Sequence, residues 1–510
     1  MKETQLSIIP RPVSIRYGEG SFESQGITSL CGDGVFSKEI EVFSSQLVQD
    51  AKKMGLSGFS EKPVNIEKVM VPAGEFEPAE SYRLCILPKG ITLTAASGAG
   101  VYRGLQVTRQ LFLSGYRDGT ITLPCAEISD YPRFPWRGFM LDCSRHFYTI
   151  PFIKRLLDVL SLHHINRFHW HLTDDQGWRL PIPEYPLLTE IGSRRLDSRM
   201  PWRSYIGGFY SDEEIRDLVD YATLRHIEII PEVDLPGHTS AVLASYPGLG
   251  CTGGPYKVED GFGIMEDVLC AGNDLMFDLF TKIFDTLARL FPSSYVHIGG
   301  DEVPRVRWES CPKCQRKLTE LGLKNAGELQ SYITARLVQM LAERGKTAIG
   351  WDEVLEDSPS FKLPKETVVM SWRGTEGGIN ASGLGHRVIM SPSTCGCYLD
   401  YKYSDEPEEP GQLYNGPASV YKSYSMDPVT PEMTDKNASM IIGGQCNLWS
   451  EFIYADRISE YMIFPRLCAI AEALWTPREN KDFDDFSRRL LVHRKRLDDL
   501  GLIQYHGPLQ

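Results

Sequence analysis

The fold is decided by the stretch GFMLDCSRHFYTIPFIKRLLDVLSLHHINRFHWHLTD, residues 138–174. Two short apolar runs, at 138–144 and 167–172, have the length and composition of buried strands. Between them, at 151–163, apolar residues recur with the spacing of an amphipathic helix. A strand, a helix and a second strand in this order indicate an α/β fold.

The same alternation continues through the following residues. Eight strand candidates occur, at 138–144, 167–172, 228–234, 295–299, 347–351, 367–372, 387–391 and 440–448. Helical patterns follow most of them, including those at 151–163, 212–226, 274–291 and 328–344. Eight strand–helix repeats are typical of a (β/α)8 barrel, the TIM barrel.

The N-terminal part has another pattern. Strands are expected at 82–86 and 91–95, and a helix at 97–112. Strand pairs with a helix indicate a small α+β domain, and a proline-punctuated linker follows it. We therefore predict two domains: an α+β domain at 1–130, and the barrel with a C-terminal helix at 131–510.

Composition excludes several classes of partner. The 510 residues carry a formal charge of −13 and include no long basic stretch, so neither nucleic acid nor an anionic membrane is expected as a partner. No apolar run approaches the roughly 18 residues of a membrane span. No signal peptide is expected from the first residues, so a periplasmic or secreted location would require a leader that had been removed. Compartment and oligomeric state stay open, a homo-oligomer included.

Twelve cysteines are spread thinly along the chain. They do not form the dense framework of a small disulfide-rich protein, and their redox state stays open. Cys311-Pro-Lys-Cys314 is a CxxC pair, but a zinc knuckle needs a second pair at suitable spacing, and we find none in the sequence. We therefore expect a plain loop there.

Chemistry in a (β/α)8 barrel lies at the C-terminal ends of the strands. Nearly every strand candidate ends in polar or aromatic residues: Asp142, Arg145, Thr173, Asp174, Asp175, Asp234, His238, Asp301, Glu302, Trp351, Asp352, Glu353, Trp372, Arg373, Tyr398, Asp400, Trp449 and Glu451. Random scatter would produce two or three such ends, so this edge is the predicted active site.

The sharpest motif is His297-Ile298-Gly299-Gly300-Asp301-Glu302. Two glycines permit close backbone approach or unusual dihedral angles before two adjacent carboxylates. Neighbouring side chains on a strand point to opposite sides, so the two carboxylates can address different parts of one ligand. A solvated acidic loop is the alternative, but the barrel position favours a glycosidase acid and its partner.

Tryptophans and arginines extend the candidate site. Trp351, Trp372 and Trp449 end three strands, where flat apolar faces suit a sugar ring better than three separate core positions. Arg137 and Arg145 bracket the first strand, and an arginine fork can hold two hydroxyl groups. A surface salt bridge is the alternative, and we favour Arg137 for the binding role.

Two other functions are open at this point. His169-Trp170-His171 resembles the start of a metal-dependent amidohydrolase, such as a deacetylase, but later strand ends lack a clear set of further ligands. We therefore expect no metal and no cofactor. A catalytically silent sugar-binding protein is the third hypothesis, and the intact pair of Asp301 and Glu302 speaks against it.

Several motifs together resemble the family 20 glycoside hydrolases, the β-N-acetylhexosaminidases. In the barrel they occur in order at 137–142, 169–179, 231–238, 297–302, 350–353 and 448–451. Residues 5–130 resemble the family's non-catalytic N-terminal domain, with matching stretches at 80–84 and 99–106. The barrel resemblance covers residues 135–478.

The resemblance implies roles for individual residues. Glu302 would be the general acid/base, Asp301 would contact the acetamido N–H, and Asp174 with His238 would form a relay that tunes Glu302. The implied substrate-binding residues are Arg137 for ring hydroxyls, Tyr398 for the acetamido oxygen, Glu451 for outer hydroxyls, and Trp351, Trp372, Trp449 and Asp400 in the pocket. Asp175, Glu232 and Asp234 receive no role.

The implied activity is that of a retaining exo-β-N-acetylhexosaminidase, whose partner is a glycan ending in β-linked GlcNAc or GalNAc. Most glycosidases use a second carboxylate as nucleophile or base, but this family is an exception. Here the substrate's own acetamido oxygen would attack the anomeric carbon and form an oxazolinium intermediate. The preferred sugar, the linkage and the aglycone stay open.

Overall fold

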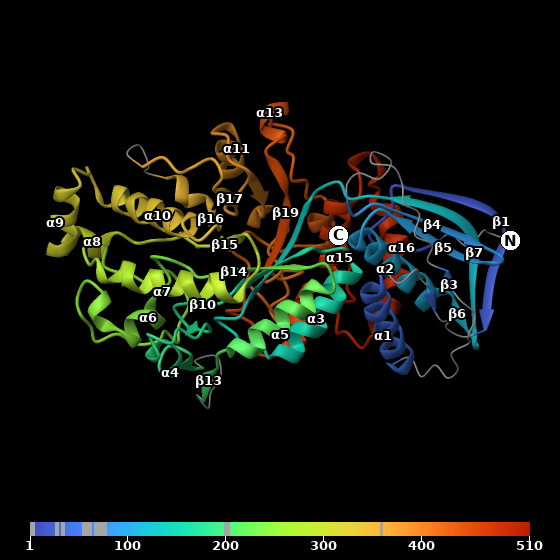
Figure 1. The fold of residues 1–510 in the computed structure, drawn as a ribbon, viewed down its shortest axis with the longest axis horizontal. Coiled ribbons are helices and arrows are strands. Elements are labelled where there is room, and N and C mark those ends of the chain that lie inside the picture. Colours follow the sequence, from blue (N-terminus) through green and yellow to red (C-terminus); the bar gives the residue numbers. More distant parts are fainter. Residues whose placement is uncertain are drawn as a thin grey trace.

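A computed structural model describes most of the chain. The described residues are 6–25, 30–31, 36–53, 64–65, 79–197, 204–356 and 361–510. They form two sheets, an open one near the N-terminus and a closed barrel, each with its own hydrophobic core (Figure 1). This arrangement confirms a (β/α)8 barrel preceded by a small α+β domain. No helix among the described residues is long and apolar enough to cross a membrane.

The N-terminal sheet is mainly antiparallel. Its order is β1 (Ser14–Gln25), β7 (Thr120–Asp130), β4 (Tyr82–Leu87), β5 (Gly90–Ala95), β3 (Val64–Asn65) and β2 (Leu30–Cys31), with β6 (Tyr116–Arg117) beside β7. The predicted strand pair is confirmed in β4 and β5, which pair antiparallel. The predicted helix is α2 (Gly98–Gly115), which the Ser97 side chain caps by accepting from the Gly100 N–H.

Helix α2 joins the two domains. One side packs on β4, β5 and β7, while the other contacts α3 and α16 of the barrel domain. Nearly all its residues are buried, as expected for a helix enclosed on every side. The second helix of this domain, α1 (Ser37–Lys53), packs against α2, and its Asp50 binds Arg109 of α2 at 2.6 Å.

The barrel closes with all eight predicted strands. In order they are β8 (Trp136–Asp142), β9 (Arg167–His171), β14 (Glu228–Glu232), β15 (Tyr295–His297), β16 (Thr347–Trp351), β17 (Val368–Ser371), β18 (Val388–Met390) and β19 (Ile441–Leu448), each parallel to its neighbours. The main helices of this domain are α3 (Ile150–Leu162), α5 (Asp212–Thr223), α7 (Leu275–Leu290), α10 (Ala326–Ala342), α11 (Glu376–Gly383), α14 (Asp456–Ile463), α15 (Arg466–Trp475) and α16 (Phe483–Asp499). The four helices named from the sequence pattern are confirmed in α3, α5, α7 and α10.

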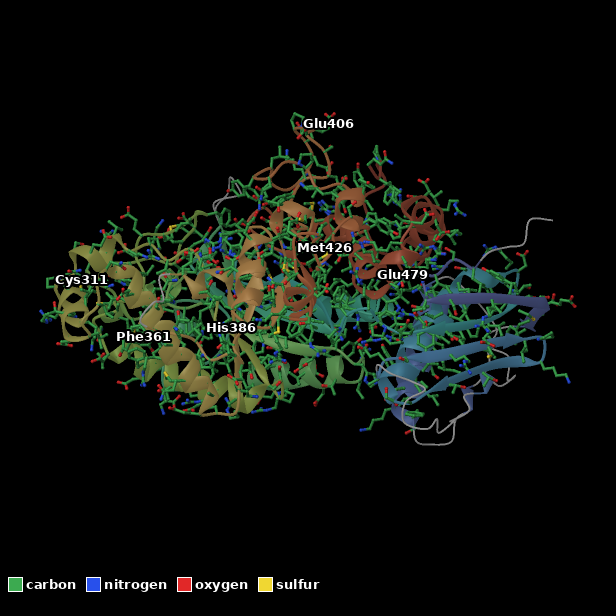
Figure 2. All side chains as sticks on the ribbon, turned by 90° about the horizontal axis from the view of Figure 1, so that it is seen from above. Cys311, Phe361, His386, Glu406, Met426 and Glu479 are labelled. Carbon is green, nitrogen blue, oxygen red and sulfur yellow. The ribbon has the colours of Figure 1, made fainter. Side chains whose placement is uncertain are left out.

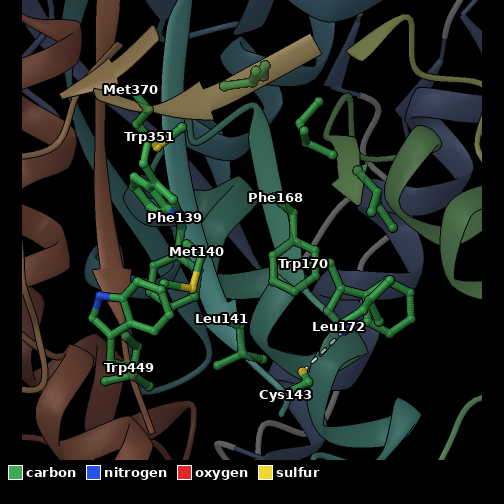
Figure 3. Close-up of a cluster of buried hydrophobic side chains, with 14 of the residues drawn as sticks. Phe139, Met140, Leu141, Cys143, Phe168, Trp170, Leu172, Trp351, Met370 and Trp449 are labelled. Carbon is green, nitrogen blue, oxygen red and sulfur yellow. Dashed lines mark hydrogen bonds between the residues drawn. The ribbon is translucent and has the colours of Figure 1, made fainter. Parts of the chain in front are cut away.

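The strands are buried on both faces, which is why they read as continuous apolar runs. Every residue of β8 is buried, and Figure 3 shows Phe139, Met140 and Leu141 of this strand within a cluster of buried hydrophobic side chains. The Trp170 indole donates to the Cys143 sulfur at 3.1 Å, so the polar edge of this large ring has a partner. Trp351 and Trp449 belong to the same buried cluster, and only parts of their rings reach the barrel mouth.

Candidate active site

A cavity of about 400 Å³ opens beyond the C-terminal ends of the strands. Its size and its mixture of aromatic and charged groups fit a small ligand. The lining residues are Arg145, His238, Phe262, Gly263, Ile264, Asp301, Glu302, Trp351, Trp372, Tyr398, Tyr401, Gln412, Tyr414, Asn415, Trp449, Glu451 and Phe452.

A larger hollow of about 1200 Å³ lies between the two domains. Two of the three acidic groups that line it are engaged: Glu80 binds Arg103 at 2.7 Å and Arg137 at 2.5 Å, and Glu228 binds Arg167 at 3.2 Å. Because these carboxylates are already neutralised, we assign the chemistry to the smaller cavity.

Asp301 and Glu302 occupy two different environments. Gly299 and Gly300, with φ of +65° and +95°, turn the chain sharply after β15. A Cβ on Gly299 would lie 1.8 Å from Asp234 Oδ1, so the turn requires glycine. The Asp301 side chain is 11% exposed, whereas the Glu302 side chain is 32% exposed, and both line the cavity. The two adjacent carboxylates therefore lie in different surroundings; their separate tasks stay a prediction.

The Asp301 carboxyl group has a buried oxygen without a hydrogen-bond donor in the part of the chain that the structure describes. Burial, and then the neighbouring charge of Asp234, raise the pKa of Asp301 well above its ordinary value, although His238 opposes the shift. Oδ1 of Asp301 is buried, and no described residue donates a hydrogen bond to it. A buried acceptor without a donor is costly, so this oxygen favours a ligand that brings an N–H or O–H group.

His238 connects this pair to a second acidic pair. Its Nδ1 lies 3.3 Å from Asp174 Oδ1 and 3.2 Å from Asp175 Oδ2, and its Nε2 lies 3.6 Å from Glu302 Oε2 and 3.7 Å from Asp301 Oδ2. Burial alone would lower the pKa of His238, but the surrounding carboxylates, Asp174 first, raise it well above the ordinary value. The raised pKa favours a cationic imidazole, which lies beside both Asp301 and Glu302.

Further buried groups hold this network in place. Asp175 accepts from the backbone N–H and the hydroxyl of Ser240, at 2.9 and 2.6 Å. Asp174 forms an ion pair with Arg145 at 2.8 Å and accepts from His171 Nε2 at 2.9 Å. The sequence assigned no role to Asp175, which here shares His238 with Asp174.

The aromatic walls are fixed by hydrogen bonds from the indole groups. Trp351 donates to Glu232 at 3.1 Å, and Trp372 donates to Glu353 at 2.9 Å. The Trp372 ring is nearly parallel to Tyr398, with an angle of 14° and centroids 6.3 Å apart. Because these rings have little freedom, the pocket is preorganised for a ligand with flat apolar surfaces.

Arg145 and Glu451 form the polar wall. Arg145 lies 3.7 Å from Glu451 and stacks over the Trp449 ring at 5.1 Å. Oε2 of Glu451 is buried without a hydrogen-bond donor among the described residues. Both groups can bind hydroxyls. Asp400 does not line the cavity; it is buried behind Gln412, which donates to it, and burial followed by the charge of Glu451 raises the pKa of Asp400 to about 8.

The structure corrects the role predicted for Arg137. The prediction that it binds the ligand is wrong, because it lies near the N-terminal end of β8, at the opposite end of the barrel from the cavity. Its guanidinium donates to the carbonyls of Phe134 and His164, at 2.7 and 2.8 Å, and to Glu80 of the N-terminal domain. It is fully buried and ties the domains together. Arg145, the less favoured candidate, lines the cavity instead.

The histidines of the HxH motif surround a buried carboxylate inside the barrel. Glu232 lies 2.9 Å from His169 Nε2 and 2.9 Å from His297 Nδ1, and its carboxylate accepts from His171 Nδ1. Gln445 lies 3.0 Å from the other nitrogen of His169. Close charge contacts hold this cluster around Glu232, which also accepts from the indole of Trp351.

Residues on loops were missed by the sequence reasoning. Phe262, Gly263 and Ile264 come from the loop after α6 (Ser240–Ser245), and Tyr401, Gln412, Tyr414 and Asn415 come from the segment after β18. Neither loop has a periodic pattern or a motif, so no sequence signal marked these residues.

Comparisons with known proteins support the same fold and show the family. Residues 134–478 match the family model described as glycosyl hydrolase family 20, catalytic domain, and residues 5–131 match its domain 2. A β-hexosaminidase of Porphyromonas gingivalis is 39% identical over 99% of this chain, but the chain spans only 65% of that protein's length. A β-hexosaminidase of Akkermansia muciniphila is 35% identical over 82% of this chain and 83% of its own.

Solved structures show the same likeness. The exo-β-N-acetylglucosaminidase of Vibrio harveyi in complex with N-acetylglucosamine is 32% identical, with a TM-score of 0.87, over 98% of this chain and 78% of that one. A mutant β-hexosaminidase of Streptomyces plicatus in complex with its product GlcNAc is 29% identical, with a TM-score of 0.84, over 99% and 97%.

Proposed function

The chain belongs to glycosyl hydrolase family 20, and on that premise we propose that this glycoside hydrolase is a retaining exo-β-N-acetylhexosaminidase. It releases a terminal β-linked GlcNAc or GalNAc from the non-reducing end of a glycan. The carrying observation is the buried, undonated oxygen of Asp301 beside the exposed carboxyl of Glu302. The Asp301 oxygen can accept a hydrogen bond from an amide N–H, and the Glu302 carboxyl can donate a proton to the glycosidic oxygen.

In the first step, the acetamido carbonyl oxygen of the substrate attacks the anomeric carbon. The bond from that carbon to the leaving oxygen breaks, and Glu302 supplies the proton that the leaving group takes away. Asp301 accepts from the acetamido N–H, and the positive charge that grows on the amide as the oxazolinium ring forms favours the ionised form of Asp301 against the effect of burial on its pKa. The carboxylate in turn stabilises that positive charge. His238 stabilises the resulting Glu302 carboxylate.

In the second step, Glu302 takes a proton from a water molecule as that water attacks the anomeric carbon. The ring opens, the acetamido group is restored, and Glu302 regains its proton. Two successive inversions at one carbon retain the configuration. Asp301 and Glu302 return to the protonation states in which they began, so the proposed cycle uses only the substrate, water and these side chains.

The residues that line the cavity support exo action. Trp351, Trp372 and Trp449 line the space that would hold one sugar ring. Arg145 and Glu451 would bind the hydroxyl groups of that ring that lie farthest from the scissile bond. A further sugar on that side would have to displace these polar contacts. We therefore propose that only the terminal sugar of the glycan enters the cavity.

The proposed activity is tested on a panel of substrates. Aryl β-glycosides of GlcNAc, GalNAc, 6-sulfated GlcNAc and glucose are compared, together with a time course on a chitooligosaccharide. We expect cleavage of N-acetylhexosaminides, almost none of the glucoside, and only monosaccharide from the first time points. Early release of internal disaccharides would contradict exo action, and comparable glucoside cleavage would contradict the role of the acetamido group.

The two arginines give a matched pair of variants. Arg145→Lys loses the planar fork at the cavity, so we expect KM to rise about tenfold or more. Arg137→Lys loses carbonyl contacts at the domain interface, so we expect the free energy of unfolding to fall by about 1–3 kcal/mol with KM unchanged. Steady-state kinetics and urea unfolding on both variants check this. A rise in KM for Arg137→Lys alone would restore the original assignment.

A further inference from the structure

Four cysteines that the proposed catalysis does not use converge at one point. We propose that Cys251, Cys270, Cys311 and Cys314 bind one Zn²⁺ ion as a structural tetrathiolate site. Their sulfur atoms all lie within 4.8 Å of one another. The cluster lies on the barrel domain, and Figure 2 shows Cys311 at the end of the molecule away from the N-terminal sheet.

The sulfur spacing fits a tetrahedral zinc ion. Cys251 and Cys314 are 3.8 Å apart, Cys270 and Cys311 are 3.8 Å apart, and Cys270 and Cys314 are 3.6 Å apart. Zinc–sulfur bonds of about 2.3 Å in a tetrahedron place the sulfurs roughly 3.8 Å apart. The sulfurs of a disulfide would lie about 2.05 Å apart. The spacing therefore suits a shared ion better than two covalent bonds.

The local backbone is built for close approach of two cysteine pairs. Cys311 and Cys314 sit at the start of α9 (Pro312–Glu320), where a CxxC turn brings both sulfurs to one side. A Cβ on Gly272 would lie 2.1 Å from the carbonyl carbon of Lys313, so a glycine is required where the two segments meet. The bridge between Gly250 and Leu269 aligns the residues next to Cys251 and Cys270.

Four thiol ligands favour a soft metal ion and a coordination sphere that is filled by protein ligands alone. Cys270, Cys311 and Cys314 are buried, and Cys251 is half-buried. The candidate group consists of thiols alone, which favours zinc or iron over calcium or magnesium. Four protein thiolates leave no position for water, so the ion has a structural and not a hydrolytic role.

The site connects the cavity wall to the segment that follows the catalytic pair. Cys251 and Cys270 delimit the loop that carries Phe262, Gly263 and Ile264 into the cavity. Cys311 and Cys314 follow Glu302 through α8 (Val306–Ser310). A zinc ion would fix both ends of the loop to this segment, so that the wall formed by Phe262 and Ile264 keeps its position. The structural site thus bears on substrate affinity more than on the chemical step.

Sequence spacing concealed this site. The CxxC pair is close in sequence, but Cys270 precedes Cys311 by 41 residues and Cys251 precedes Cys314 by 63. The loop between Cys251 and Cys270 has no second CxxC. The prediction of a plain loop at Cys311–Cys314 is therefore replaced by one half of a metal-binding cluster, and the expectation of no metal applies to the catalytic chemistry only.

The first test uses the unmodified chain, purified without metal-affinity resin or chelators. We expect elemental analysis to give about one zinc per chain, and a mercurial that modifies thiols to release that zinc to a colorimetric chelator. Mass spectrometry of the unreduced protein should show four reduced thiols in the cluster. Metal-free protein with reactive thiols, two disulfides, or iron with its visible absorption band would each overturn the zinc assignment.

The second test uses matched cysteine variants. Cys270→Ser and Cys314→Ser should lose zinc, and we expect their affinity for added zinc to fall more than about 100-fold. KM should rise more than kcat falls. Cys125→Ser, a buried cysteine of the N-terminal sheet, is the control and should keep zinc and KM. If the serine variants do not fold, the half-buried Cys251→His, which supplies another zinc ligand, should retain the ion. Full zinc occupancy in Cys270→Ser or Cys314→Ser would overturn the site.

Discussion

Glu302→Gln is expected to lower kcat by about 10²–10⁴-fold on substrates with poor leaving groups, because the amide cannot donate the proton that the departing oxygen needs. The structure favours this carboxyl as the acid, since it is the exposed member of the pair and lies 3.6 Å from the cationic His238. The measurement is kcat and kcat/KM on a series of aryl glycosides whose leaving groups span a wide range of pKa.

The loss should shrink as the leaving group improves. A dinitrophenolate departs without protonation, so the variant should approach the parent enzyme in the first step on that substrate. Glu190→Gln, at an exposed position in α4 (Leu187–Glu190), is the matched control and should be fully active. Equal losses with good and poor leaving groups would remove Glu302 from the acid role, and an altered unfolding midpoint would point to a structural defect.

The barrel could be predicted from the sequence because its physical signals are local. A parallel strand covered on both faces must be a short apolar run, and β8 is buried at every position. A helix on the outside must alternate apolar and polar residues with helical spacing, as α3 and α7 do. The chain direction then places Asp301 and Glu302 at the C-terminal edge without any knowledge of tertiary contacts.

The same rule explains the error at Arg137. Arg137 lies at the start of β8 and Arg145 follows its end, so the strand direction alone favours Arg145 for the active-site edge. Arg137 was favoured for binding although it lies at the N-terminal end of the strand. Sequence also could not reveal that Glu80, from the other domain, would neutralise Arg137.

Contacts between distant loops could not be predicted. Gln412 reaches the cavity and donates to the buried Asp400, and neither residue lies in a pattern that fixes their approach. The meeting of Cys270 with Cys314 likewise depends on the path of two irregular segments. Such contacts depend on how the loops pack and not on a periodic pattern. The sequence can therefore suggest individual functional side chains in these loops, but it cannot predict which of them meet.

Asp301→Asn is expected to slow turnover of N-acetylhexosaminides by about 10²–10³-fold, because a neutral amide cannot stabilise the positive charge that grows on the acetamido group. A thiazoline analogue of the cyclic intermediate should inhibit the parent enzyme strongly and the variant weakly, since the site is built to hold that state. In the parent enzyme, rates should fall steadily from acetyl to mono-, di- and trifluoroacetyl substrates, because fluorine withdraws electrons from the attacking oxygen. Kinetics and inhibition constants measure both effects.

The competing mechanism is direct attack on the sugar by an enzyme carboxylate, Asp301 included. It predicts a covalent glycosyl-enzyme that a 2-fluoro sugar would trap, and little dependence of the rate on fluorination of the acetyl group. The environment of Asp301 argues for the assisted route, because its undonated Oδ1 is buried and Asp301 is only 8% exposed. Asp405→Asn, at an exposed position, is the matched control for charge loss and should leave the series unchanged. Mass spectrometry that finds a glycosylated carboxylate, together with a flat fluorination series, would replace the acetamido nucleophile by an enzyme one.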